Sequence, residues 1–461
     1  MSDCSPLPPD ITSLETSNDP SHTQSYTELA LPTASTFVST EDSHDARLVA
    51  MSALSLLEED ARPSCRDGYQ RKHGNQGPNT SLWKTHKKHF FILSASGKPI
   101  YTRYGDETKL ASFMGVIQAI ISYYADEDDS IRSVCAGGHL FVFHVRGPLY
   151  LVAVSSTGES EYQLRKQLDM LFDQITLTLT ALQLDRIFKQ RVNYDLRNLI
   201  WGTEIFMDTL CKSFQRDSSI FLESMQCTRI PSRLRDRLTQ ALIDAAPPKD
   251  LLFGLLFAKD RLVTLLRPRN YTLHPKDIYL LVNMIMSSST FRTVQSWTPV
   301  CLPHFNNRGF LHTYSEYKQR IVHAFNSNGI IPALDAAIHV RDFSVCISEL
   351  RHFIIKSRTM GQFVEPQPIA PYTRSQDRKR LQRLYQYALE LGSLRPTISN
   401  VSCFSTHHET VVYQATSTME IYAAFGPIVK KDIVVSALVE LKKWAKQNDE
   451  TLFMKSSPLL F

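Results

Sequence analysis

The spacing of apolar and polar positions predicts regular elements from Trp83 onward. Apolar runs at 89–94 and 99–104 flank a short glycine-containing turn, as in a β-hairpin. A helix is expected next, because apolar residues from Leu110 to Tyr124 recur every three or four positions and share one buried face. Three strands and a long helix are predicted after it, at 131–135, 140–145, 149–154 and 161–190.

This order of elements recurs twice along the chain. The second copy is predicted at 251–257, 262–266, 274–287 (helix) and 297–302. The third copy is predicted at 352–356, 362–364, 376–391 (helix), 401–404, 410–415, 420–425 and 431–446 (helix). Each copy would place an antiparallel sheet against helices, so the repetition predicts an α+β protein of three similar domains.

The first 82 residues differ from the rest in composition. They are rich in Ser, Thr, Pro and acidic residues and poor in aromatics, so they cannot bury enough apolar surface to fold, and we expect a disordered tail. One apolar stretch within it, 48–57 (LVAMSALSLL), is long enough for about two to three helical turns. It would be either a docking segment for a partner or a transient helix without a role.

Charge divides the chain in the same place. Residues 1–80 hold twelve Asp and Glu against five Lys and Arg, which leaves +12 on the remainder of a chain whose net charge is +5. Two basic clusters are candidates for contact with phosphoinositide headgroups: Arg378, Lys379, Arg380, Lys430 and Lys431. A charged helix face that only aids solubility is the alternative. Nucleic acid is not expected as a partner, because no aromatic stacking motif accompanies the charge.

No motif for covalent chemistry is found in the sequence. Gly97-Lys98 is followed by Pro99, where a phosphate-binding loop needs Ser or Thr, and GxGxxG and HExxH are absent. The paired histidines, His86 with His89 and His407 with His408, lack neighbouring ligands at metal-binding spacing. Catalytic residues, metals and cofactors are therefore not expected.

Other sequence features bear on location. The eight cysteines form no CxxC pair, as in reduced cytosolic proteins. No apolar run approaches the roughly 18 residues that a membrane-spanning helix needs, so any membrane contact is expected to be peripheral.

Several segments resemble, in the same order, those of one known family. They are 89–105 (HFFILSASGKPIYTRYG), 193–197 (NYDLR), 296–305 (SWTPVCLPHF), 349–356 (ELRHFIIK), 370–373 (APYT) and 384–387 (LYQY). They resemble the monensin-sensitivity vacuolar fusion proteins, also called the SAND family, over residues 83–461. The resemblance implies three longin domains, at 83–192, 193–330 and 331–461, after the tail at 1–82.

The resemblance also implies a function. Such proteins form a heterodimer with the calcium-caffeine-zinc sensitivity protein, and the pair acts as a guanine-nucleotide exchange factor for the late-endosomal Rab GTPase. Binding to the early-endosomal Rab and to phosphatidylinositol 3-phosphate is expected too. The chain would then act peripherally on late endosomes, lysosomes or vacuoles, without covalent chemistry of its own. A trafficking adaptor or tether component built from the same domains is the alternative.

In the family, the first longin domains of the two subunits pair and bind the Rab together. The residues expected at this surface are Lys98, Tyr101, Arg103, Met114, Gln118 and Tyr123. Met114 also belongs to the buried helical pattern.

The second domain departs from the family pattern. Where a further apolar strand is normally found, 313–317 (TYSEY) leads almost directly into a helical pattern at 318–325. This shortened domain is expected to lack one or more strands, with an unpaired edge or an altered pairing as the result.

Overall fold

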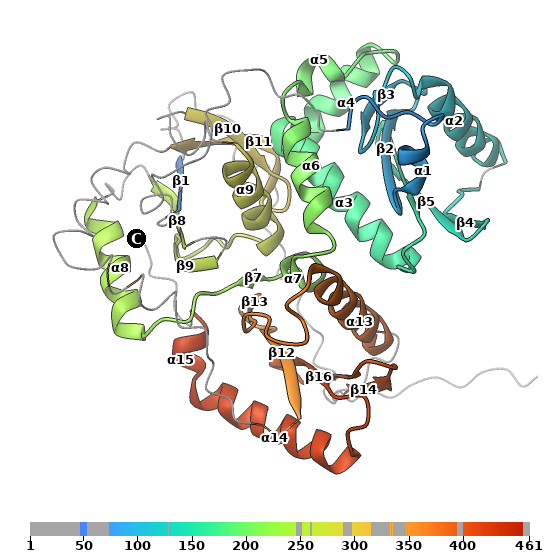
Figure 1. Ribbon diagram of the computed structural model, residues 1–461. Helices are drawn as coiled ribbons and strands as arrows, with labels where there is room; N and C mark the ends of the chain where they lie inside the picture. Colours follow the sequence, from blue (N-terminus) through green and yellow to red (C-terminus); the bar gives the residue numbers. More distant parts are fainter. Residues whose placement is uncertain are drawn as a thin grey trace, which may run out of the picture. The chain divides into compact units, whose positions relative to one another are not determined.

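The structure is a computed structural model that describes residues 47–52, 73–127, 129–245, 251–258, 261–288, 297–314, 349–393 and 400–454, together with 332, 334 and 347. Its described strands form three sheets, each packed against helices (Figure 1). The α+β class and the three longin-like repeats predicted from the sequence are thereby confirmed.

The first sheet is antiparallel and has the strand order β3-β2-β6-β5-β4. Its strands are β2 (Lys88–Ser94), β3 (Pro99–Thr102), β4 (Ser133–Ala136), β5 (His139–Arg146) and β6 (Leu149–Ser155), with the short helix α1 (Ser81–Thr85) before them. Alternate side chains of β2 enter two cores: Phe91 packs with α2 (Ala111–Asp126), and Phe90 packs with α3 (Glu161–Thr178). Both faces of this sheet are therefore covered.

The long helix predicted at 161–190 is two helices. α3 ends at Thr178, and α4 (Ala181–Gln190) begins after Thr180, whose side-chain oxygen accepts a hydrogen bond from the backbone N–H of Gln183. Threonine favours this capping role over a helix interior, so the prediction of one continuous helix was wrong.

The third sheet repeats the plan of the first. β12 (Leu350–Ser357) and β13 (Gln362–Val364) form its hairpin, and β14 (Asn400–Ser405), β15 (Thr410–Ala415) and β16 (Met419–Phe425) complete it. The order is β14-β15-β16-β12-β13, and β7 (Met225–Gln226) adds a sixth strand beside β13. α13 (Ser375–Ser393) packs on one face, α14 (Lys431–Gln447) packs on the other, and α15 (Asp449–Leu452) follows.

In the described part of the connection between the first and second domains there are four helices: α5 (Arg197–Ile200), α6 (Glu204–Ser213), α7 (Ser218–Leu222) and α8 (Ser232–Ala245). The second sheet contains β8 (Leu251–Ala258), β9 (Arg261–Leu266), β10 (Trp297–Leu302) and β11 (Asn306–Tyr314), with α9 (Pro275–Ser287) against it. α3 and α9 lie in one hydrophobic core with α6, so the first two domains are packed together.

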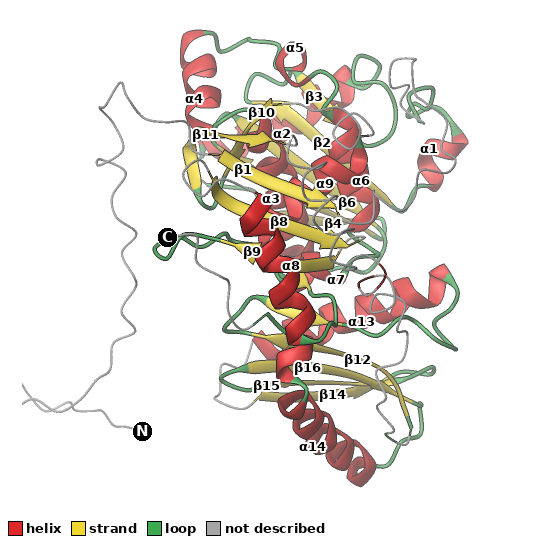
Figure 2. Ribbon diagram, turned by 90° about the vertical axis from the view of Figure 1, so that its left-hand side faces the viewer, coloured by secondary structure: helices red, strands yellow, loops and turns green. Residues whose placement is uncertain are grey.

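A fifth strand of the second sheet comes from far upstream. β1 (Arg47–Ser52) lies between β8 and β11, so the order is β10-β11-β1-β8-β9 (Figure 2). The helix predicted at 48–57 is therefore wrong for 48–52, which is extended; 53–57 lie outside the described residues. Tertiary pairing with β8 decides the conformation, because a short apolar segment has no strong local preference for helix or strand.

Candidate functional site

Helix α2 carries apolar residues on two sides. Its inner side, which includes Ile117 and Ile121, is buried against β2, β5 and β6. A second set spaced by four, three and one residues projects from the outer side, and we call it the α2 outer stripe: Val116, Ile120, Tyr123 and Tyr124. Val116 is 58% exposed and Tyr123 is 66% exposed. Grouped apolar side chains left open to water mark a surface that another protein can cover.

The sequence assigned Ile120 and Tyr124 to the buried face, and the structure corrects this, since they are 39% and 37% exposed. A helix turns about 100° per residue, so 116, 120 and 123 fall on one side, 114, 117 and 121 fall on another, and 124 lies between the two sets. That second periodicity was readable in the sequence and was missed.

A strand edge belongs to the same domain as this stripe. Among the described strands, β4 pairs only with β5, so its outer backbone groups face no strand. Val134 on β4 and Val145 on β5 are 40% and 48% exposed. An open edge with apolar side chains suits the addition of a partner strand or helix.

Lys98 lies at the β2–β3 turn, and this turn is next to Gln118 of α2. Gly97 has a positive φ of 77°, and a Cβ added there would touch Gln118 at 3.4 Å, so the turn rests on the helix. Lys98 is exposed and its ammonium donates to the backbone oxygen of Asn193. Gln118 is half-buried and donates to Ser122. With Tyr123, these are the predicted site residues that reach the surface.

The other three predicted residues lie inside the domain. Met114 is fully buried under α2. The Tyr101 hydroxyl donates to Asp208 of α6 at 2.7 Å, and Arg103 forms an ion pair with the same carboxylate at 2.7 Å. Burial raises the pKa of Tyr101 well above its ordinary value and that of Cys211 to about 12. These groups join β3 to α6 and present no side chain to a partner.

The predicted basic residues of α13 have different environments. Arg380 is held by carboxylates, with Asp377 at 2.6 Å and Glu409 at 2.9 Å, whereas Arg378 is exposed. The pKa of Lys379 is lowered, first by partial burial and then by repulsion from neighbouring cations. These cations come from three parts of the chain, and with Lys379 they form the α13 basic cluster: Lys87, Arg216, Lys379 and Arg383.

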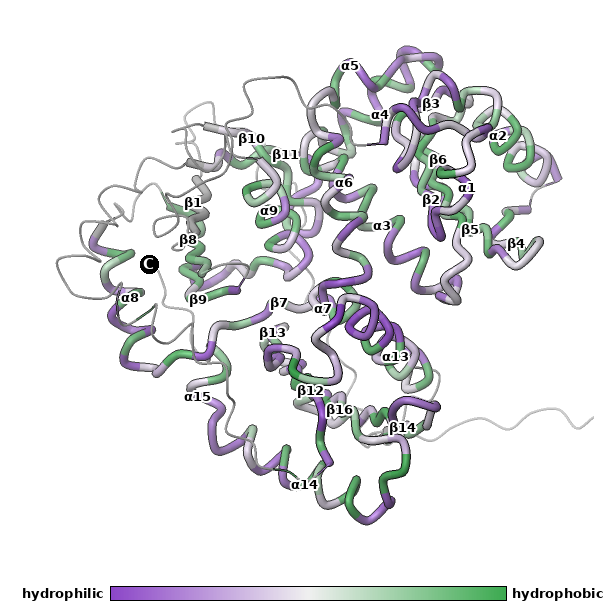
Figure 3. Tube along the Cα trace, viewed as in Figure 1, coloured by the Kyte–Doolittle hydropathy of each residue, from purple (hydrophilic) through white to green (hydrophobic). Residues whose placement is uncertain are grey.

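Charges of one sign held together in this way favour an anion as a ligand. Figure 3 shows α13 as largely hydrophilic, which matches its polar composition. Lys430 and Lys431 are exposed where α14 begins, and α14 covers the opposite face of the sheet from α13. Helix packing therefore separates the two predicted lipid-binding groups.

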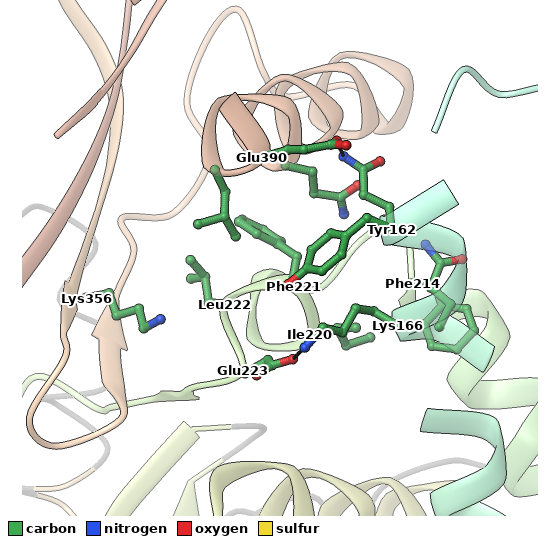
Figure 4. Close-up of a pocket in the computed structure, with 13 residues that line it drawn as sticks. Tyr162, Lys166, Phe214, Ile220, Phe221, Leu222, Glu223, Lys356 and Glu390 are labelled. Atoms are coloured by element: carbon green, nitrogen blue, oxygen red, sulfur yellow. Dashed lines mark hydrogen bonds and ion pairs between the residues drawn. The ribbon is translucent and has the colours of Figure 1, made fainter. Parts of the chain in front are cut away.

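A small cavity lies between α3, α7 and α13 (Figure 4). Its volume is about 170 Å³, below the roughly 300 Å³ at which small-molecule sites usually begin. An ion pair of Lys166 with Glu223 at 2.5 Å and a hydrogen bond from Gln163 to Glu390 at 3.2 Å lie along its wall. The geometry indicates a polar junction between the first and third domains.

Of the paired histidines, His86 and His89 pack against aromatic side chains. His86 stacks on Tyr104 with ring centroids 3.6 Å apart, and His89 is buried beside Trp83. Burial lowers the pKa of His89 to about 4, so this imidazole is neutral at physiological pH. His407 and His408 are exposed.

Across the described part of the chain, no three His, Cys, Asp or Glu side chains lie together as a metal site would require. None of the helices described combines the length and apolar character needed to cross a bilayer.

Three family models match the chain in succession. They are described as the first, second and third longin domains of FUZ, MON1 and HPS1, and they match residues 88–210, 249–329 and 349–449. The chain is similar to vacuolar fusion protein MON1 homolog A of Gallus gallus, with 37% identity over 406 residues that cover 81% of this chain and 73% of the relative. Protein SAND of Takifugu rubripes is 35% identical over 425 residues, 85% of this chain and 80% of that protein.

A fungal relative extends this similarity. Vacuolar fusion protein MON1 of Cryptococcus neoformans var. neoformans serotype D is 35% identical over 402 residues, which cover 80% of this chain and 65% of the relative. The family resemblance seen in the sequence is thus confirmed. With three longin models matched in order and relatives similar across most of its length, this chain belongs to the MON1/SAND family of vacuolar fusion proteins.

Proposed function

We propose that this chain is one subunit of a heterodimeric guanine-nucleotide exchange factor that activates a late-endosomal Rab GTPase. In this role it drives the maturation of early into late endosomes and their fusion with lysosomes or vacuoles. Family membership supports the trafficking role, since the relatives are named as vacuolar fusion proteins. The exposed α2 outer stripe is the observation that supports the formation of a heterodimer.

The partner proposed is the longin-containing calcium-caffeine-zinc sensitivity protein, bound at the α2 outer stripe and the open β4 edge. Tyr123 and Val116 are each more than half exposed, so docking would remove their apolar surface from water. Large aromatic residues in the middle of an interface commonly contribute most of its binding energy.

The Rab would bind across the paired first domains, next to the surface residues Lys98 and Gln118. An exchange factor needs no acid, base or metal, because it accelerates nucleotide release by binding the opened state of the GTPase more tightly than the closed state. The proposed surface therefore needs only to bind the opened state of the Rab more tightly than the closed state.

Membrane attachment would be peripheral and electrostatic. The α13 basic cluster, with Arg378 beside it, would bind phosphoinositide headgroups, each basic residue near the surface contributing about 1 kcal/mol. Lys430 and Lys431 would contribute at a separate place. The early-endosomal Rab would recruit the complex, and the late-endosomal Rab would be its substrate.

The decisive experiment measures release of fluorescent GDP from the late-endosomal Rab. The chain would be tested alone and with its purified partner, in solution and on phosphoinositide-containing liposomes. We expect acceleration only when both subunits are present. A verified heterodimer that leaves GDP release at its spontaneous rate would favour a trafficking adaptor or tether component instead.

A further inference from the structure

The second sheet differs from the other two in its central strand. In the first sheet, β6 lies between β2 and β5 and is antiparallel to both. In the third sheet, β16 lies between β12 and β15 in the same way. Each of these strands comes directly after a neighbouring strand in the sequence, so both domains complete their sheets locally.

In the second sheet this central place belongs to β1, which is parallel to both β8 and β11. β1 precedes the whole first domain in the sequence, whereas β8 follows it. Within the described residues, the strand after β11 is β12, which belongs to the third sheet. The described part of the second domain therefore supplies the two sides of a slot and not the strand that fills it.

Without a strand between β8 and β11, the folded second domain would be less stable. β8 is buried along its length, with Phe253 and Leu255 inaccessible to solvent, and Figure 3 shows it as a hydrophobic segment. Its backbone groups that face β11 would have neither water nor a strand to bond with, at about 1–3 kcal/mol for each unsatisfied group. All six residues of β1 pair with β8, so β1 meets this requirement.

We infer that the slot between β8 and β11 is a strand-binding site, and that Arg47–Ser52 is the donor strand that fills it from within the same chain. Four consecutive apolar residues, 48–51 (LVAM), suit a strand in the middle of a sheet better than an alternating pattern would. Main-chain hydrogen bonds supply most of the affinity in such β-augmentation, and they form in the parallel as well as the antiparallel direction.

The test disrupts the donor strand in the full-length chain. Proline has no N–H and interrupts a central strand, so the double variant Val49→Pro/Met51→Pro cannot pair normally. We expect hydrogen–deuterium exchange of the β8 and β11 amides to become at least about tenfold faster, because exchange follows the free energy of local opening. Exchange in β5 and β6 should not change. The matched control, Val38→Pro/Thr40→Pro, places two prolines with the same spacing upstream of β1 and should exchange like the wild type.

Rescue in trans gives a second readout. A synthetic peptide of residues 45–54, added to the double variant, should restore the protection of β8, whereas the same peptide with both prolines should not. Unchanged β8 protection in the double variant would overturn the inference. If the variant unfolds throughout, refolding with the peptide decides: recovery of β8 protection supports the donor strand, and failure to recover overturns it.

Discussion

At the residue scale, Asp208 shows how strongly the interior of the first domain depends on one carboxylate. It accepts the hydroxyl hydrogen bond of Tyr101 and pairs with Arg103, and both sides of the ion pair are only 6% exposed. Because Arg103 cannot lose its charge, removal of the carboxylate would leave a buried cation without a counter-charge.

We expect Asp208→Ala to lower the free energy of unfolding by about 3–5 kcal/mol, the usual cost of breaking a buried ion pair from one side. Urea denaturation followed by circular dichroism measures this. Asp195→Ala is the control, because its partner Arg197 and the carboxylate are roughly one-third exposed, and its effect should stay below about 1 kcal/mol. If both variants lose the same free energy of unfolding, Asp208 contributes no more than a partly exposed carboxylate does.

His89 links the stability of the first domain to pH. Its pKa is lowered to about 4 by burial, and among the described residues its Nδ1 has no hydrogen-bond partner. In the unfolded chain, the imidazole of His89 therefore binds a proton below about pH 6.5. In the folded chain, it stays neutral until the pH falls to about 4. This contribution to stability is present above pH 6.5 and is lost as the pH falls toward 4.

His89→Phe should reduce that acid sensitivity, since a phenyl ring cannot titrate. The urea midpoints at pH 7.5 and pH 5 give the measurement: the difference between them should be smaller for His89→Phe than for the wild type. His407→Phe, at an exposed histidine, should keep the wild-type difference. A variant at position 89 with the full wild-type difference would contradict this account.

At the scale of single elements, α2 buries one face in the fold and exposes the α2 outer stripe, which we propose for the partner. Val116→Glu/Tyr123→Glu places two charges on the α2 outer stripe, where they would be desolvated in a complex. We expect loss of at least about 2 kcal/mol of binding to the longin partner, roughly thirtyfold in affinity, and little change in melting temperature.

Isothermal titration calorimetry measures the affinity for the partner, and a thermal melt of the free chain checks its folding. Val435→Glu/Val439→Glu on α14 is a matched control, because these valines are 61% and 63% exposed on another helix. Normal affinity in the α2 variant would remove this face from the proposed interface.

At the scale of the whole molecule, the α13 basic cluster joins side chains from the first domain, the connector and the third domain. Lys379→Glu/Arg383→Glu should weaken binding to phosphoinositide-containing liposomes by at least about tenfold, given about 1 kcal/mol for each cation lost. Cosedimentation measures this binding, which should also weaken with salt.

The control Lys442→Glu/Lys443→Glu changes the net charge by the same amount on α14. Equal weakening by both double variants would mean that total charge, and not the cluster, determines membrane binding. Such a result would leave the proposed attachment site without support.

Local pattern predicted most of the fold. Each hairpin, the helices at 110–124 and 376–391, and the strands of the third domain are present, because their apolar periodicities admit only one kind of element. The single helix at 161–190 was wrong because the capping of one side chain, that of Thr180, outweighs an otherwise continuous helical pattern.

The site was less readable than the fold. Lys98, Gln118 and Tyr123 reach the surface, whereas Tyr101 and Arg103 are covered by α6, an element distant in sequence. The pattern of one strand cannot show which remote helix packs on it.

By itself, then, the sequence determined the class of the fold, the three repeats and their family. The tertiary structure alone decided which residues of the first domain remain exposed, which cations meet around Lys379, and that 47–52 forms a strand. The physical reason is the range of the interactions: periodicity and turn chemistry act between near neighbours, whereas burial, charge clustering and strand pairing depend on segments that only folding brings together.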